Sequence, residues 1–159
     1  MGKVEVGQGG TLFLGEIGDL SLTVQARVVR LLEEGTFERH GGTEVIEANV
    51  RVIAATNRDV EKMVSNGTFR QDLALFLQKI QVRLPSLRER PEDIAPLVNH
   101  FMEEMAVHLG REVPQLSPEA DQALQAHDWP GNIRELEHRI QRAVAECTES
   151  VIQTEDVGV

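Results

Sequence analysis

The stretch from Gly9 to Asp19 constrains the fold of this chain more than any other. Its apolar run, Thr11–Leu14, is too short for a helix, is bracketed by glycines and is closely followed by Glu16. This pattern predicts a strand buried on both faces, as in a parallel sheet with helices on each side. Ligands of open α/β sheets bind beyond the carboxyl ends of the strands, which makes Glu16 a candidate for chemistry. The alternative is a surface carboxylate that opens a loop.

The residues that follow alternate between helical and extended patterns. Asp19 is expected to cap a helix through Glu34 whose buried face holds Val24, Val28, Leu31 and Leu32, with Gly35 as its stop. A hairpin is predicted over 36–47 with a Gly41-Gly42 turn, then a strong strand over 50–55, a short helix capped by Asp59, and a third strand over 80–84. Residues 1–10 lack periodicity and are expected to be a poorly ordered lead-in.

Beyond Pro91 the composition shifts from strand-forming to helical. Three helices are predicted, over 91–109, 117–126 and 132–147, and Ser117-Pro118 has the cap and first-turn proline of a helix start. The chain is therefore predicted to be α/β, with an α/β domain over residues 1–90 and a helical domain over 91–159.

Composition narrows the classes of function. A formal net charge of -10 and a pI near 4.9 argue against a broad surface for nucleic acid or anionic membrane. No apolar run approaches the roughly 20 residues of a membrane span, and no secretory signal is expected at the start. A single cysteine, Cys147, forms no internal disulfide, which fits the cytoplasm, and its late position in a helix favours packing over a nucleophilic role. The five histidines have no metal-ligand spacing, so no metal site is predicted.

Six stretches occur in an order and at separations typical of one family. They are Gly9–Asp19, Phe37–Gly42, Arg51–Asp59, Phe69–Leu73, Arg83–Arg90 and Trp129–Leu136. Together, over roughly residues 5–157, they resemble the central AAA+ ATPase domain (the sigma-54 interaction domain) of bacterial enhancer-binding activators that act on sigma-54 RNA polymerase. The fold class implied is an incomplete AAA+ P-loop NTPase sheet with a C-terminal helical lid.

The resemblance also implies roles for single residues. Glu16 matches the Walker B glutamate that polarises the attacking water, and Arg70 matches an arginine finger that reaches a neighbouring subunit's nucleotide. Thr56 and Asn57 match sensor I, which reports the state of the γ-phosphate, and Arg134 matches the sensor II arginine of the lid. The family cofactors are ATP and Mg²⁺. This chain departs from the family at Gly15, where an aspartate orients Mg²⁺, and at Phe76, where a further arginine usually stands.

Each of these residues has a plainer alternative. Asn57 is suited to capping the helix that follows its strand, and Arg70 and Arg134 are suited to exposed positions on helices.

Two family segments do not occur among the 159 residues. There is no Gly-x-x-x-x-Gly-Lys-Ser/Thr phosphate loop and no Gly-Ala-Phe-Thr-Gly-Ala loop for gripping sigma-54. We therefore expect no ATPase activity from this chain alone, and weak binding of nucleotide at best. In the family the phosphate-loop strand lies between the sensor I strand and the one expected at 80–84. Its absence is expected to leave open strand edges that rearrange or pair between chains.

Two functions remain open at this point, and whether the chain is an enzyme is open with them. The first is a truncated piece of the ATP-binding, transcription-regulating domain of a sigma-54-dependent activator of the response-regulator type. The second is a non-catalytic module that docks on AAA+ subunits and modulates them. Other AAA+ subunits are the expected partners, in a homo-oligomer, and sigma-54 RNA polymerase is the partner in the family. Direct DNA binding is disfavoured because residues 111–150 are more acidic than basic.

Overall fold

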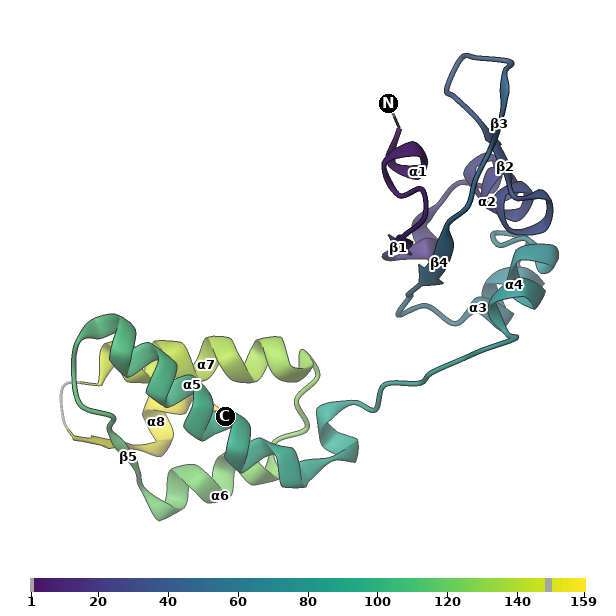
Figure 1. Cartoon of the computed structure of the whole chain (residues 1–159). Coiled ribbons are helices and arrows are strands. Elements are labelled where there is room, and N and C mark those ends of the chain that lie inside the picture. Colours follow the sequence, from purple (N-terminus) through teal and green to yellow (C-terminus); the bar gives the residue numbers. More distant parts are fainter. Residues whose placement is uncertain (1, 148–149) are drawn as a thin grey trace. The chain divides into compact units, whose positions relative to one another are not determined.

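The computed structural model describes residues 2–147 and 150–159 and divides into two compact units, 1–82 and 83–159 (Figure 1). The first unit contains α1 (Lys3–Val6), β1 (Thr11–Leu14), a 3₁₀ turn η1 (Ile17–Asp19), α2 (Leu22–Glu34), β2 (Thr36–Glu38), β3 (Val45–Glu47), β4 (Arg51–Ala54), α3 (Val60–Ser65) and α4 (Gln71–Leu77). The second contains η2 (Leu87–Glu89), η3 (Pro91–Asp93), α5 (Ile94–Leu109), β5 (Gln115–Leu116), α6 (Pro118–Ala126), α7 (Asn132–Glu146), β6 (Val151–Ile152) and α8 (Thr154–Val157).

A short parallel sheet organises the first unit. β1 and β4 pair in parallel, from Thr11 opposite Arg51 to Leu14 opposite Ala54, as the two strand patterns predict. One face of this sheet packs on a core to which α2 and α4 contribute, with Ile17, Val28, Phe69 and Leu73 at its centre.

The other face of the sheet is exposed, so the prediction of a strand buried on both faces is wrong. Phe13 and its register partner Ile53 are 64% and 45% exposed. Alternate residues of a strand point to opposite faces, and in the described part of the chain only one face of this sheet is packed against a core.

The helix and hairpin after β1 match the predicted pattern, with two corrections. Gly35 ends α2 in a left-handed conformation (φ 63°) as expected, and β2 pairs antiparallel with β3. The helix cap is Ser21, whose hydroxyl accepts a hydrogen bond from the Val24 amide, whereas Asp19 lies in η1 and forms an ion pair with Arg58. Val24 is 39% exposed, because the buried stripe of α2 runs through position 25 rather than 24.

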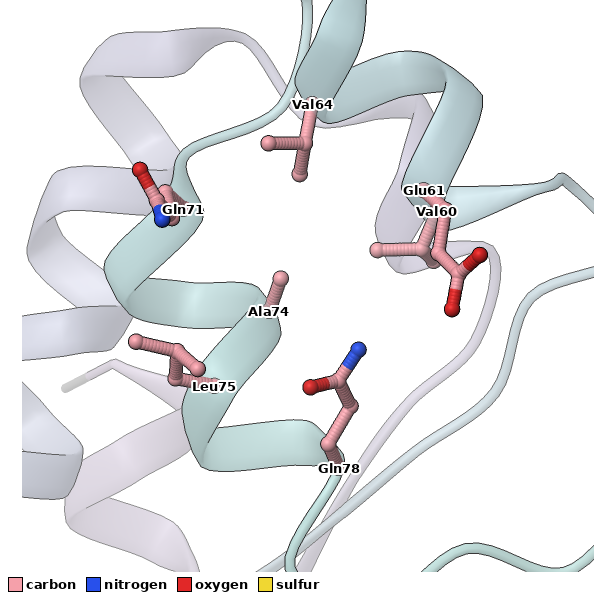
Figure 2. A pocket seen from close by; sticks show the side chains of 7 residues that line it. All are labelled: Val60, Glu61, Val64, Gln71, Ala74, Leu75 and Gln78. Atoms are coloured by element: carbon pink, nitrogen blue, oxygen red, sulfur yellow. The ribbon is translucent and has the colours of Figure 1, made fainter.

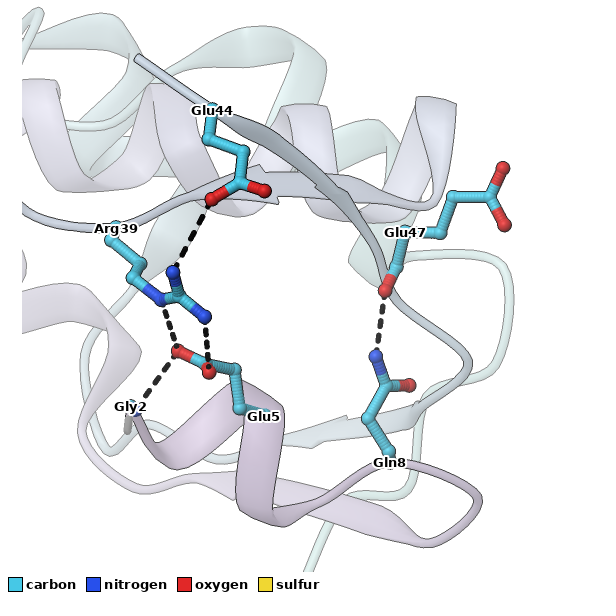
Figure 3. A network of polar contacts seen from close by, with 6 residues as sticks. All are labelled: Gly2, Glu5, Gln8, Arg39, Glu44 and Glu47. Atoms are coloured by element: carbon cyan, nitrogen blue, oxygen red, sulfur yellow. Dashed lines mark hydrogen bonds and ion pairs between the residues drawn. The ribbon is translucent and has the colours of Figure 1, made fainter. Parts of the chain in front are cut away.

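The start of the chain is ordered, contrary to prediction, because its side chains bind the hairpin. Glu5 pairs with Arg39 (3.0 Å), which also contacts Glu44 (3.3 Å), as Figure 3 shows. Gln8 donates to the Glu47 carbonyl (2.6 Å) and accepts from the Asn49 amide (2.7 Å). Because these partners lie more than 30 residues away, local sequence pattern could not reveal them.

The predicted third strand does not form. Residues 81–86 carry no regular structure, and Ile80, Val82 and Leu84 are 80–86% exposed. A strand is stabilised by the ladder to its neighbour, and the sheets of the described residues pair only β1 with β4, β2 with β3 and β5 with β6. Residues 80–84 therefore have the alternating apolar pattern of a strand, but no strand in the described part of the chain pairs with them.

The second unit is a helical bundle around α5 and α7. Its core contains Trp129, Leu136, Ile140 and Cys147, and the Trp129 indole N–H donates to the Leu124 carbonyl (3.0 Å). Ser117 caps α6 by accepting from the Ala120 amide (3.2 Å), as predicted. Among residues 2–147 and 150–159, no helix has both the length and the apolarity needed to cross a membrane.

Candidate functional site

The parallel pairing of β1 and β4 brings three of the predicted site residues to one edge of the sheet. Because Leu14 is opposite Ala54, the residues that follow the two strands, Glu16 on one side and Thr56-Asn57 on the other, are neighbours. The Ala55 amide donates to the Leu14 carbonyl (2.9 Å) and continues the ladder past the strands. The Asn57 amide donates to Glu16 Oε2 at 3.5 Å, the long end of the hydrogen-bonding range.

Glu16 has a backbone conformation that is unfavourable for a side chain. Its φ of 51° and ψ of 47° are left-handed, which costs a non-glycine residue about 1–2 kcal/mol. Such outliers persist where the surrounding structure imposes them, and they concentrate at functional sites. The residue is exposed, so its carboxylate faces solvent at the sheet edge. Glu16 is thus an exposed carboxylate with a left-handed backbone, directly before η1.

Gly15 leaves the neighbouring position without an oxygen ligand. A Cβ at this position would lie 3.3 Å from the Phe13 ring, so a longer side chain would require the ring to move slightly. The described residues contain no group of three or more His, Cys, Asp or Glu side chains that could hold a metal ion. In the part of the chain that the structure describes, no cluster of side chains thus suits a protein-held Mg²⁺.

Thr56 is half-buried, and its side chain contacts neighbouring residues. Its hydroxyl accepts from the Arg58 amide (3.1 Å), and the buried Gly18 of η1 lies directly against it. Asp59, not Asn57, caps α3, because its carboxylate accepts from the Lys62 amide (3.1 Å). This hydrogen bond is the main reason that the pKa of Asp59 lies below its usual range. The alternative role of Asn57 as the helix cap is therefore wrong.

Arg70 opens α4 and is held by an acidic neighbour. Its Nε and Nη2 atoms donate to the two oxygens of Asp72 at 3.0 and 2.6 Å. The hydrogen bond from Arg70 lowers the pKa of Asp72, and the same contact raises the pKa of Arg70. The Arg70 side chain is 41% exposed, so its guanidinium is accessible while it remains paired.

Gln25 is a residue of this region that sequence reasoning missed. It is fully buried on α2, and its side chain accepts from the backbone amide of Arg70 (2.8 Å). The sequence signal for its burial was its spacing, because Gln25 lies three residues before Val28 and four before Val29, on the face of α2 that is buried.

Arg134 lies in the second unit, on the first turn of α7, and is exposed. The turn before it is fixed by Glu135, which accepts from the Gly131 amide (2.8 Å) and pairs with Arg139 (2.8 Å). These contacts, the first above all, lower the pKa of Glu135. Arg134 thus occupies an exposed position on a helix, which is what its plainer alternative predicts.

Two hollows of the first unit are lined by residues other than Glu16. One is a groove between α3 and α4 with an apolar floor of Val60, Val64 and Ala74 (Figure 2). Another is a shallow surface lined by Arg70, Gln71, Asp72 and Leu75. Arg70 therefore lies at a hollowed surface at the start of α4.

The fold and this edge define a class of protein. A parallel strand pair with a carboxylate and a Thr-Asn pair at its carboxyl edge, joined in sequence to a helical lid, is the architecture of an AAA+ domain. A sequence model of the sigma-54 interaction domain matches residues 1–83, and one of the AAA+ ATPase lid domain matches residues 88–158. The chain belongs to the sigma-54 interaction domain family.

Several proteins of known name are similar in sequence to this chain over most of its length. The chain is 51% identical over 143 residues to the DNA-binding transcriptional activator HyfR of Escherichia coli, covering 90% of this chain and 21% of HyfR. It is 46% identical over 156 residues to the regulatory protein AtoC of E. coli (98% and 34%), and 43% identical over 154 residues to the DNA-binding transcriptional regulator NtrC of Rhizobium meliloti (97% and 32%). The chain thus spans between a fifth and about a third of the length of these relatives.

Solved structures show the same fold. The crystal structure of NtrX from Brucella abortus in complex with ADP matches with a TM-score of 0.92 and 35% identity, over 98% of this chain and 36% of that one. The structure of NtrX in complex with ATP matches equally well. The incomplete AAA+ sheet and lid that the sequence predicts are therefore confirmed as the fold class.

Proposed function

We propose that this chain is the Walker B, sensor and lid portion of the ATP-binding, transcription-regulating domain of a sigma-54-dependent activator of the response-regulator type. Glu16 is the water-polarising carboxylate, Thr56 and Asn57 sense the nucleotide, Arg70 acts on a neighbouring subunit, and Arg134 contacts nucleotide from the lid. Residues 1–90 and 91–159 are the proposed domains, other AAA+ subunits and sigma-54 RNA polymerase are the proposed partners, and the cytoplasm is the proposed location.

One observation carries this proposal. The register of β1 on β4 sets the Glu16 carboxylate against the Asn57 backbone amide, at 3.5 Å, at the edge where α/β sheets bind ligands. A movement of the Thr56-Asn57 segment therefore reaches the Glu16 carboxylate directly. The left-handed backbone of Glu16 gives independent support, because strain of this kind is retained where it serves a function.

The same geometry supports inactivity of the 159-residue chain in isolation. Gly15 supplies no oxygen for Mg²⁺, and the described residues contain neither a metal-ligand cluster nor a phosphate cradle. We expect no ATP hydrolysis by the isolated chain, and no low-micromolar binding when Mg-ATP is titrated calorimetrically. A dissociation constant in the low-micromolar range would contradict the proposal.

A second candidate function is favoured by the exposure of Arg70. A guanidinium that is 41% exposed at a hollowed surface is available to another chain. The chain would then dock on intact AAA+ subunits as a non-catalytic module, offering Arg70 in trans or blocking the ring.

The two candidates are separated by adding the chain to an intact relative such as AtoC and measuring ATP hydrolysis. A change in rate that depends on chain concentration supports docking, and no change leaves the chain as a portion that works only within its own complete domain. The Arg70→Ala variant is the control that separates an effect of the guanidinium from simple blocking. A change in rate that is identical for wild type and Arg70→Ala would exclude a role for Arg70 in trans.

A further inference from the structure

Gln25 has no contact with solvent, yet every polar atom of its side chain is used. Its Nε2 donates to the carbonyls of Leu20 (2.8 Å) and Thr68 (3.2 Å), and its Oε1 accepts from the Arg70 amide (2.8 Å). The orientation of the amide is determined by this network, because a flip would set the amide donors against the Arg70 N–H. The side chain thereby ties α2 to a segment more than 40 residues away.

A buried amide is an unfavourable choice for packing alone. A methionine fills nearly the same volume without polar atoms, whereas a glutamine must be fully hydrogen-bonded to be tolerated. Two of the three hydrogen bonds of Gln25 go to backbone groups on either side of Phe69, which is itself only 3% exposed. The backbone of residues 68–70 is therefore held at two points by hydrogen bonds and between them by a buried ring.

This arrangement holds the Arg70 backbone rigidly but leaves its side chain accessible. Arg70 is the N-cap residue of α4, and its backbone amide donates to Gln25 Oε1 at 2.8 Å. The guanidinium, in contrast, pairs with the partly exposed carboxylate of Asp72. Exchange of Asp72 for an incoming anion would leave the hydrogen bond between the Arg70 amide and Gln25 in place.

We infer that Gln25 is a positioning residue for Arg70, which fixes the backbone from which the guanidinium reaches an anionic group on a neighbouring subunit. This inference rests on the role in trans proposed for Arg70. A misplacement of about 1 Å at such a group is enough to lower a rate about 100-fold. Loss of the Gln25 hydrogen bonds should therefore weaken the effect of Arg70 while the fold is retained.

The test uses the whole 159-residue chain added to intact AtoC, with ATP hydrolysis as the readout. Wild type should change the rate in a manner that Arg70→Ala abolishes. Gln25→Met should reduce that change by about 10-fold to 100-fold, and should have no further effect in the Arg70→Ala background. The change should appear in kcat with KM for ATP unaltered, because the guanidinium acts on developing charge. Gln122→Met, at an exposed position of α6, is the matched control and should behave as wild type.

A second measurement reports the hydrogen bond directly. In amide hydrogen exchange, Gln25→Met should remove protection at Arg70 while the core amides of α2 remain protected. Should Gln25→Met not fold, Gln25→Asn is the second variant: it keeps an uncharged amide but is one methylene too short to span the same partners, so it should also lose protection at Arg70 and most of the effect on AtoC.

The outcomes distinguish the two proposals. An Arg70-dependent effect that Gln25→Met leaves intact overturns the positioning role and supports the proposed role of Arg70. The absence of any Arg70-dependent effect overturns the role of Arg70 in trans and the inference with it. Retained protection of the Arg70 amide in Gln25→Met overturns the inference whatever the rate.

Discussion

Gly18 is the point at which a single methyl group should disturb the sensor strand. This glycine is buried in η1, and a Cβ built on it would lie 2.9 Å from Thr56 Oγ1 and 3.1 Å from Arg58 Cδ. A separation under 3.0 Å is not sustained in folded proteins, so Gly18→Ala requires Thr56, Arg58 or η1 to move. The sheet edge that carries Asn57 would move with Thr56.

The size of the destabilisation caused by Gly18→Ala depends on which neighbouring group moves. Arg58 Cδ belongs to a flexible, half-exposed side chain and can yield at small cost. The Thr56 hydroxyl is less free, because its rotation forfeits the hydrogen bond from the Arg58 amide (3.1 Å), worth about 1 kcal/mol. With the strain of overpacking included, we expect Gly18→Ala to lower the free energy of unfolding of the first unit by about 1–3 kcal/mol.

Urea unfolding followed by the amide NMR signals of α2 measures this change. The single tryptophan, Trp129, lies in the second unit and does not report it. Gly42→Ala is the control, since its Cβ would have no neighbour closer than 3.6 Å, and it should be neutral or stabilising by up to about 1 kcal/mol. In Gly18→Ala/Thr56→Ala the nearest oxygen is gone, so the double variant should be less destabilised than the sum of the single variants.

Two results would refute the reasoning. Gly18→Ala could prove as stable as Gly42→Ala, in which case the close approach to Thr56 carries no energetic weight. The effects of Gly18→Ala and Thr56→Ala could instead be additive, in which case the cost arises elsewhere in η1.

Three further outcomes are expected. The pKa of Glu5 is lowered from 4.5 to about 2, chiefly by the hydrogen bond from Arg39. This ion pair therefore stabilises the folded state above pH 4.5, and its contribution is lost as the pH falls through about 2. The difference in stability between wild type and Glu5→Gln, measured by thermal unfolding, should disappear over that range, and a difference that is constant with pH would contradict this expectation. Because the alternating apolar residues around Val82 are exposed, light scattering should show association that rises with concentration and that Val82→Lys reduces, whereas a strictly monomeric wild type would exclude pairing through this segment. Ser117→Ala should cost about 1 kcal/mol in urea unfolding through loss of the α6 cap, while Ser65→Ala, at an exposed helix position, should cost little; equal effects would argue against a special role for the cap.

Much of the fold was predictable because its signals are local. A glycine in a left-handed conformation ends α2, Ser117 caps α6, and two short apolar runs form β1 and β4. Each depends on a few consecutive residues whose conformational preferences agree with the final structure. The position of Glu16 beyond the end of its strand followed from the same kind of reasoning, whereas Thr56 and Asn57 were singled out by the resemblance to the AAA+ family.

The errors occurred where a residue depends on a distant partner. The lead-in became ordered through Arg39 and Glu47, far along the chain, and the segment over 80–84 stayed irregular because it has no strand to pair with. Ser21, not Asp19, caps α2, and Asp19 instead forms an ion pair with Arg58. Boundaries and caps that compete within a few residues are decided by such contacts rather than by propensity.

By itself, then, the amino-acid sequence determined the class of fold and most of the order of the elements, because periodicity and turn chemistry depend on neighbouring residues. The residues expected at the sheet edge beside Glu16 came from the resemblance to a family. Only the tertiary structure decided that Glu16 has a left-handed backbone, that Arg70 is held by Asp72, and that a buried Gln25 supports Arg70 from another helix. These are contacts between segments brought together by burial. Their geometry depends on the packing of the whole unit, which no local pattern specifies.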